Sequence, residues 1–170
     1  MPRAAPRIAI RAATLADLDV VVELRLELLR EHARNPLYAW LRPDAPERAR
    51  ELFAQQLKSK TETTFLARRG TETVGILRCV ESGGSPLLDP SRYCYVSSVY
   101  VVPDARRGGV LRALMARAES WCRERGFSEM RLHSTPENAV GGAAWDALGF
   151  RVVEQLRLRR LIEPLAPGLE

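Results

Sequence analysis

The sequence has no long apolar run. No stretch of its 170 residues approaches the roughly 20 apolar residues that a membrane helix needs, and its first residues, MPRAAPRIAIRAAT, hold no apolar segment long enough for a secretory signal. We therefore predict a cytoplasmic protein without a membrane partner. The Arg- and Ala-rich start is also compatible with a mitochondrial transit peptide, although Ile8 to Arg11 already has the pattern of a strand.

Cysteine is scarce as well. The three cysteines, Cys79, Cys94 and Cys122, cannot all pair, and their spacing matches no zinc-binding pattern. Each lies inside an apolar strand or helix pattern, which predicts that it packs in the core. The sequence therefore favours a reducing compartment and predicts no metal site.

Lysine is almost missing, because only Lys58 and Lys60 accompany the arginines. The net charge of +5 could attract nucleic acid. However, the arginines are spread along the chain and form no basic tail. An anionic small ligand explains the cluster at residues 106–112 equally well, so we predict no nucleic-acid partner.

Strand and helix periodicities alternate along the chain. Thr14-Leu15-Ala16-Asp17 is a capping-box signature for the first helix, and Gly70 marks a hairpin turn. Three consecutive strands with helices before and after them indicate a single mixed α/β layered domain over residues 1–170 rather than a repeating βαβ wind. Strands are expected at residues 8–11, 64–68, 73–81, 93–102, 129–134 and 150–162, and helices at about 15–32, 46–58, 107–125 and 137–148.

The segment VPDARRGGVLRALM places two arginines and two glycines where a strand passes into a helix. It lacks the Gly-Lys-Ser/Thr of a Walker loop and the three spaced glycines of a dinucleotide fingerprint. Free amides at the helix start, the helix dipole and nearby arginines can together hold a pyrophosphate. A helix start with solvated arginines is the competing interpretation.

The segment from Tyr95 to Phe150 resembles the GNAT superfamily of acetyl-CoA-dependent N-acetyltransferases. VYVVPDARRGGVLRALM is similar to that family's acetyl-CoA motif, a strand and a proline before Arg/Gln-x-x-Gly-x-Gly/Ala, and NAVGGAAWDALGF is similar to its second signature. The resemblance, with its motif core at about 95–150, implies a GNAT-like fold. That fold has a mixed, mostly antiparallel central sheet of six to seven strands with helices on both faces, in the order β-α-α-β-β-β-α-β-α-β.

The resemblance also implies how acetyl-CoA, as co-substrate, would be held. The main chain of Val99, Tyr100 and Val101 would pair with the pantetheine arm, and the Val101 N–H would hold the thioester carbonyl. A primary amine would then attack the thioester directly in a ternary complex, which needs an oxyanion donor, removal of an amine proton and a proton for the thiolate. The coenzyme-binding residues implied by the two motifs are Val99, Tyr100, Val101, Arg106, Arg107, Gly108, Gly109, Val110, Leu111, Arg112, Asn138 and Trp145.

Four positions depart from the family's pattern. Leu111 stands where the acetyl-CoA motif closes on Gly or Ala, and a leucine there crowds the phosphate. Trp145 occupies the place of a tyrosine that is usually proposed to protonate the thiolate, and an indole is no useful acid. Ser97 and Ser98 match the place of a frequent acidic base; they cannot act alone as bases but could orient a water.

Other candidate bases are Glu81 and His133. Glu81 ends the strand expected to pair with residues 93–102, and a solvated strand end is its competing interpretation. His133 has a titration range that suits base work, and a half-buried sheet histidine is the alternative. The catalytic candidates are therefore Val101, Glu81, Ser97 and Ser98, with His133 as a further possibility.

These observations predict an N-acetyltransferase, and a catalytically impaired acyl-CoA-binding sensor or scaffold is the alternative. The expected acceptor is a small amine, an amino acid or a peptide N-terminus. No broad acidic stretch lines the predicted acceptor side, which argues against a polycation. The arginine-bearing last strand could pair with another subunit, so a homodimer is a further expectation.

Overall fold

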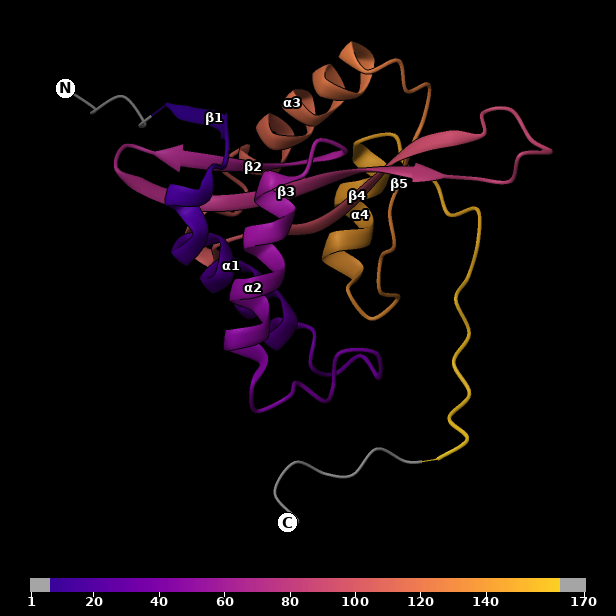
Figure 1. Ribbon diagram of the computed structural model, residues 1–170, viewed down its shortest axis with the longest axis horizontal. Coiled ribbons are helices and arrows are strands. Elements are labelled where there is room, and N and C mark those ends of the chain that lie inside the picture. The colour runs from indigo at the N-terminus through magenta and orange to yellow at the C-terminus, as the bar shows by residue number, and fades with distance from the viewer. Residues whose placement is uncertain (1–6, 163–170) are drawn as a thin grey trace.

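The computed structural model describes residues 7–162, and its centre is one sheet with the strand order β1-β2-β3-β4-β5 (Figure 1). The first four strands are antiparallel neighbours, whereas β5 runs parallel to β4. Gly70, with φ +64°, makes the predicted tight turn between β2 and β3. The strands are β1 (Ile8–Ala12), β2 (Glu62–Arg69), β3 (Glu72–Gly83), β4 (Arg92–Val101) and β5 (Met130–Arg131).

Two helices, α1 (Leu18–Glu31) and α2 (Ala45–Lys58), cover one face of the sheet (Figure 1). Their buried stripes pack with Leu66 and Ile76 of the sheet into one apolar cluster. The predicted capping box is present before α1, because the Asp17 carboxylate accepts a hydrogen bond from the Thr14 N–H over 2.8 Å. The short 3-10 helix η1 (Leu15–Asp17) connects this cap to α1.

The opposite face is covered by α3 (Val110–Glu124), whose apolar stripe forms the larger core cluster. All three cysteines are buried in this cluster, which confirms their prediction as core residues. Hydrogen bonding among these thiols together with burial raises the pKa of Cys79. A Cβ at Gly75 would lie 3.0 Å from Val110 Cγ1, so glycine is what allows the start of α3 to lie against β3.

The sheet has five strands, not the six to seven that were expected, because the strand predicted at residues 150–162 is wrong. Residues 151–162 pair with no strand in the described chain, and all of them are exposed. The alternation of Leu156 and Leu158 with arginines has the period of a strand, but a strand also needs a neighbour that supplies hydrogen bonds. The segment instead passes α4 (Ala139–Ala147) and reaches the α1–α2 loop, where Arg160 donates to the Pro36 carbonyl over 2.5 Å.

Two further boundaries differ from the prediction. The helix expected from residue 107 begins at Val110, because Arg107 and Gly109 both have positive φ and cannot continue a helix. The strand expected at residues 129–134 is reduced to the two residues of β5. None of the helices in residues 7–162 is long and apolar enough to cross a membrane.

Candidate functional site

β4 contains a bulge opposite β3. Ile76 pairs with Tyr100 and Arg78 pairs with Ser97, so Ser98 and Val99 together face the single residue Leu77. Ser98 has φ 52°, a value that a serine adopts only when its surroundings impose it. Bulges bend a strand and redirect its side chains, and they are enriched beside active sites.

Beyond the bulge, one edge of β4 is open. Within the described residues β5 pairs only with Cys94 and Tyr95, so residues 96–101 have no strand beside them on that side. The Val102 N–H donates to the Val74 carbonyl over 3.0 Å, which makes Val101 and Gly75 a pair that exchanges no hydrogen bonds. The N–H and C=O of Val101 therefore point to the open edge, while those of Tyr100 point toward β3.

The chain then passes through the 3-10 helix η2 (Pro103–Ala105) into a loop with two left-handed residues, Arg107 at φ 63° and Gly109 at φ 81°. The first intrahelical hydrogen bond of α3 runs from the Ala113 N–H to the Gly109 carbonyl. The N–H groups of the three residues before Ala113 consequently have no partner within the helix, and the helix dipole adds positive potential there. This is the geometry of an anion site.

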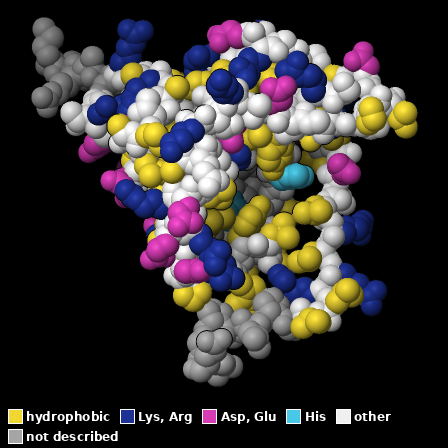
Figure 2. Space-filling model, in the orientation of Figure 1, with side chains coloured by type: hydrophobic (Ala, Val, Ile, Leu, Met, Phe, Trp, Pro, Cys, Tyr) yellow, Lys and Arg dark blue, Asp and Glu magenta, His cyan; other side chains and the backbone are white. Residues whose placement is uncertain are grey.

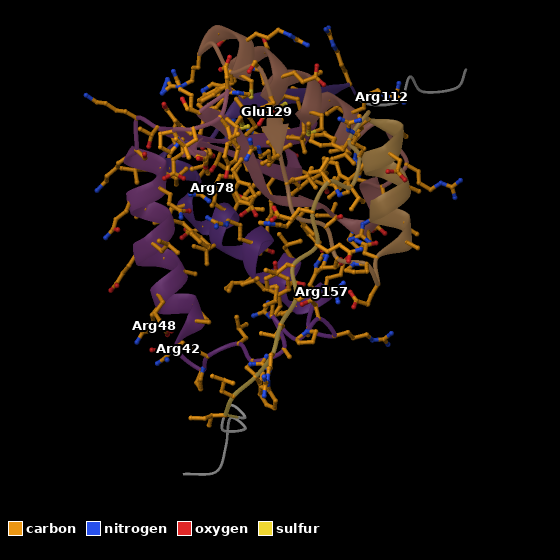
Figure 3. The ribbon with its side chains drawn as sticks, turned by 90° about the vertical axis from the view of Figure 1, so that its right-hand side faces the viewer. Arg42, Arg48, Arg78, Arg112, Glu129 and Arg157 are labelled. Atoms are coloured by element: carbon orange, nitrogen blue, oxygen red, sulfur yellow. The ribbon has the colours of Figure 1, made fainter. Side chains whose placement is uncertain are left out.

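Side chains around this helix start leave its amides accessible. Arg107, Gly108 and Arg112 are exposed, and Figure 3 shows Arg112 at the beginning of α3. Leu111 was expected to crowd a phosphate, but its side chain is half-buried against the core cluster. The leucine that replaces Gly or Ala at position 111 therefore adds its side chain to the core side of α3. Its N–H still belongs to the first turn, whose amides have no partner within the helix.

Arg106 links three parts of the site. Its Nε donates to the Val101 carbonyl over 2.9 Å, and its Nη2 lies 2.5 Å from the Glu31 carboxylate of α1. The guanidinium also lies 5.6 Å from the Tyr100 ring centroid. Arg106 is exposed, but its side chain is not free, because it ties the loop to β4 and to α1.

Asn138 and Trp145 both belong to the region of α4. The Asn138 side chain caps this helix, because its Oδ1 accepts from the Gly141 N–H over 2.9 Å. Trp145 is half-buried, packs against the core cluster and meets Phe150 edge-on with ring centroids 5.6 Å apart. The indole thus fills a packing position between α4 and the residues that follow it.

The candidate bases predicted from the sequence do not come together. Glu81 lies opposite Cys94 and forms an ion pair with Arg92 over 2.9 Å. At about 3.3 Å per residue, that register places it roughly 20 Å along the strand from Val101. Ser97 is nearer to the bulge, and its Oγ accepts a hydrogen bond from Arg78 over 3.2 Å.

A pair that sequence reasoning only half identified lies where β4 and β5 separate. The Tyr95 hydroxyl and His133 Nδ1 are 2.8 Å apart, and their rings meet edge-on. Burial raises the pKa of the Tyr95 phenol, with the nearby Tyr38 and Tyr93 adding to the effect. His133 was a candidate base, whereas Tyr95 was interpreted as one of three strand tyrosines, of which at most one would face the acceptor site. Its spacing of two residues from Ser97, on the same face of a strand, was the available signal.

On the α1–α2 side of the bulge, Ser98 lines a groove of about 350 Å³. Figure 2 shows a hollow between the α1–α2 layer and the C-terminal segment, and hydrophobic side chains gather in it. Trp40 and Leu41 of the α1–α2 loop contribute to the wall of the groove, as does Phe53 of α2. Ser98 therefore belongs both to the lining of the groove and to β4, the strand that has one open edge.

Known proteins are similar to this chain in sequence. The chain is 33% identical over 164 residues to the aminoglycoside N(6')-acetyltransferase type 1 of Stenotrophomonas maltophilia, with 94% of this chain and 95% of that protein covered. It is 41% identical over 73 residues to the protein of that name from Klebsiella aerogenes, covering 39% of this chain and 48% of the relative.

Solved structures agree in fold. An aminoglycoside N-acetyltransferase AAC(6')-Iy in complex with CoA superposes with a TM-score of 0.74 at 24% identity, covering 94% of this chain and 97% of the other. A predicted acetyltransferase with acetyl-CoA from Clostridium acetobutylicum gives a TM-score of 0.74 at 17% identity, covering 90% and 96%. The model of the Acetyltransferase (GNAT) family matches residues 26–150. The chain therefore belongs to the GNAT acetyltransferase family and is an acyltransferase.

Proposed function

We propose that this enzyme transfers an acetyl group from acetyl-CoA to a primary amine of a small molecule, by direct attack of the amine on the thioester. The observation that carries the proposal is the continuity between the open edge of β4 and the unpaired amides at the start of α3. The amides of Gly108 to Arg112 would hold the coenzyme diphosphate. The main chain of Val99 and the outward C=O of Val101, which also accepts from Arg106, would pair with the amides of the pantetheine arm as a strand would.

The chain supplies the groups that this chemistry needs. The Val101 N–H, which points to the open edge, would donate to the thioester oxygen as negative charge develops there. Tyr95 and His133 would move protons at the place where β4 and β5 separate, because the phenol can donate and the imidazole can accept through one hydrogen bond. Glu81, already paired with Arg92, is a weaker candidate for the base.

A direct assay tests this proposal. Purified protein is mixed with acetyl-CoA and a panel of small primary amines, and free thiol is followed with time. Amine-dependent thiol release with formation of the N-acetyl product is the expected result. Binding of acetyl-CoA without thiol release for any amine would contradict transfer, and absence of binding would contradict the whole site.

A second candidate, a CoA-binding sensor without turnover, is favoured by one observation. Ser97 and Ser98 stand where relatives often have an acidic base. The Ser97 hydroxyl already accepts a hydrogen bond from Arg78, and the hydroxyl of Ser98 cannot act alone as a base. The discriminating variant is Trp145→Phe, which keeps an aromatic ring against Phe150. Turnover retained in this variant, together with loss of turnover in His133→Gln, would eliminate the sensor.

We also propose that the protein is a homodimer. The C-terminal segment, residues 151–162, is extended and carries six large apolar side chains that are at least half exposed. Exposed apolar side chains at this density usually mark an interface. A second copy of the chain would supply the strand neighbour that the segment lacks in one chain.

A further inference from the structure

The groove at Ser98 combines an apolar wall with basic side chains. Its lining includes Leu26, Leu29 and Phe53, and also the arginines Arg25 and Arg48. No carboxylate is among the groups that line it in the described part of the chain. A ligand that fills this groove therefore meets hydrocarbon and positive charge.

The positive charge around the groove is only partly neutralised. Arg42 and Arg48 share one carboxylate, that of Asp44, at 2.9 and 2.6 Å. Nearby Arg78, which also holds Ser97, is paired with Glu62. Arg25 adds a guanidinium that forms no ion pair among the described residues, so the lining there holds three cations and no carboxylate.

Figure 3 shows how these groups are arranged, with Arg78 on the sheet and with Arg42 and Arg48 at the other end of the α1–α2 layer. It also shows Arg157 on the C-terminal segment. That segment carries four arginines against the single acid Glu154. The hollowed side of the molecule is therefore bordered by basic residues from two parts of the chain.

Arg25 is the cation most specifically placed. Its guanidinium carbon lies 3.5 Å from the centroid of the Phe53 ring, and its Nη1 donates to Gln56 Oε1 over 2.5 Å. The side chain is half-buried, and this burial together with the nearby charge of Arg78 lowers the pKa of Arg25 to about 9. Because its hydrogen-bond partner Gln56 is neutral, the stacked guanidinium of Arg25 keeps its positive charge uncompensated and has further N–H groups to donate. A carboxylate matches a guanidinium in both geometry and charge.

We propose that the acceptor of this enzyme carries a carboxylate beside an apolar body, in the manner of an apolar amino acid, and that Arg25 anchors the carboxylate while Ser98 lies near the reacting amine. This proposal rests on the acetyl transfer proposed above and narrows its acceptor class. It also separates this chain from the aminoglycosides for which its relatives are named, because a polycation in the groove would meet the guanidinium groups of Arg25, Arg42 and Arg48.

Matched acceptors test the proposal. 6-Aminohexanoate and L-leucine are compared with hexylamine and L-leucinamide, which lack the carboxylate, and with the polycation kanamycin. The expected kcat/KM is at least tenfold higher for each carboxylate than for its neutral match, and kanamycin is the poorest acceptor. Equal or better transfer to the uncharged amines or to kanamycin would overturn the acceptor class while leaving acetyl transfer established.

Variants locate the anchor. Arg25→Gln should lower kcat/KM for 6-aminohexanoate at least tenfold and change that for hexylamine less than twofold. Arg48→Gln, at an exposed position, should give a smaller loss of the same sign. Arg50→Gln is the matched control, because Arg50 lies on the same helix but pairs with Asp19 and does not line the groove.

A binding measurement covers the case in which no amine turns over or Arg25→Gln folds poorly. Hexanoate, a carboxylate with an apolar chain and no amine, should raise the melting temperature of the wild-type protein and of Arg50→Gln. The shift should be reduced in Arg48→Gln, and hexylamine hydrochloride should give none. Stabilisation by hexylamine instead of hexanoate, or by neither compound, would overturn the proposal.

Discussion

Arg106 Nε donates a hydrogen bond to the carbonyl oxygen of Val101 over 2.9 Å, across the 3-10 turn that separates the open strand edge from the start of α3. The same guanidinium pairs with Glu31 of α1. Arg106 therefore fixes the relative position of the two surfaces to which we propose that a single coenzyme binds. Its role is to preorganise the site, because its side chain already has protein partners.

Removal of this link should weaken coenzyme binding. We expect Arg106→Ala to raise the Kd for acetyl-CoA about tenfold, roughly 1.4 kcal/mol, because the loop and the strand edge lose their common partner. Glu31→Gln removes only the exposed ion pair, which is worth about 0–1 kcal/mol, and should change the Kd less than threefold. Calorimetric titration of the two variants measures both effects, and equal effects would show that the Val101 contact is unimportant.

Glycine at position 109 should matter for the ligand as well as for the fold. Gly109 and Gly126 stand at opposite ends of α3 with φ of 81° and 74°, so alanine at either position should cost about 1 kcal/mol of unfolding free energy. Only Gly109→Ala lies among the proposed diphosphate donors, and we expect at least tenfold weaker acetyl-CoA binding for it. Denaturant melts and calorimetry separate the two quantities; a similar loss of affinity in Gly126→Ala would refute a local role.

The Tyr95–His133 pair should control proton transfer. Tyr95→Phe and His133→Gln should each lower kcat by about 10²-fold, and the double variant should lose little more, because the two groups act through one hydrogen bond. Rate measurements with a fixed amine test this. Independent, multiplicative losses would contradict a shared role.

The same pair predicts a pH dependence. Since the pKa of Tyr95 is raised above its ordinary value, most of the phenol stays protonated up to about pH 10 and can donate while the acceptor amine becomes neutral. The wild-type kcat should therefore rise with pH and decline only above pH 10. A wild-type decline that begins below pH 9 would show that a different group carries the proton.

The C-terminal segment should determine the oligomeric state. Leu156 and Leu158 are 69% and 50% exposed in one chain, and replacing both with serine should convert a dimer into a monomer. Val140→Ser, at a still more exposed position on α4 (84%), is the control and should leave the dimer intact. Light scattering coupled to size-exclusion chromatography gives the masses; a wild-type monomer would reject the homodimer.

Local signals in the sequence predicted local structure well. The capping residues Thr14 and Asp17, the turn at Gly70 and the apolar stripe of α3 each depend on residues within a few positions of one another. The coenzyme motif was also local, because a strand end, two glycines and a helix start are contiguous in the chain. These features predicted that a strand passes into a helix here, although the helix begins at Val110 rather than at residue 107.

Features that depend on distant partners were missed or wrong. The bulge at Ser98 shows only in the register between β3 and β4, and no residue type at that position announces a positive φ. Tyr95 and His133 are 38 positions apart and meet only because β5 lies beside β4. The prediction of a strand at residues 150–162 was wrong for the same reason. Alternating apolar and charged residues suit a strand, but they do not show whether a neighbouring strand is present to pair with it.

The most direct test of the account is a titration of ¹⁵N-labelled protein with acetyl-CoA, followed through its backbone amide resonances. We predict saturable shifts concentrated at Val99, Val101 and the amides of Gly108 to Arg112, with the amide of Glu81 at the far end of β3 unchanged. Saturation with shifts confined to another region, or no shift at all in folded protein, would contradict it.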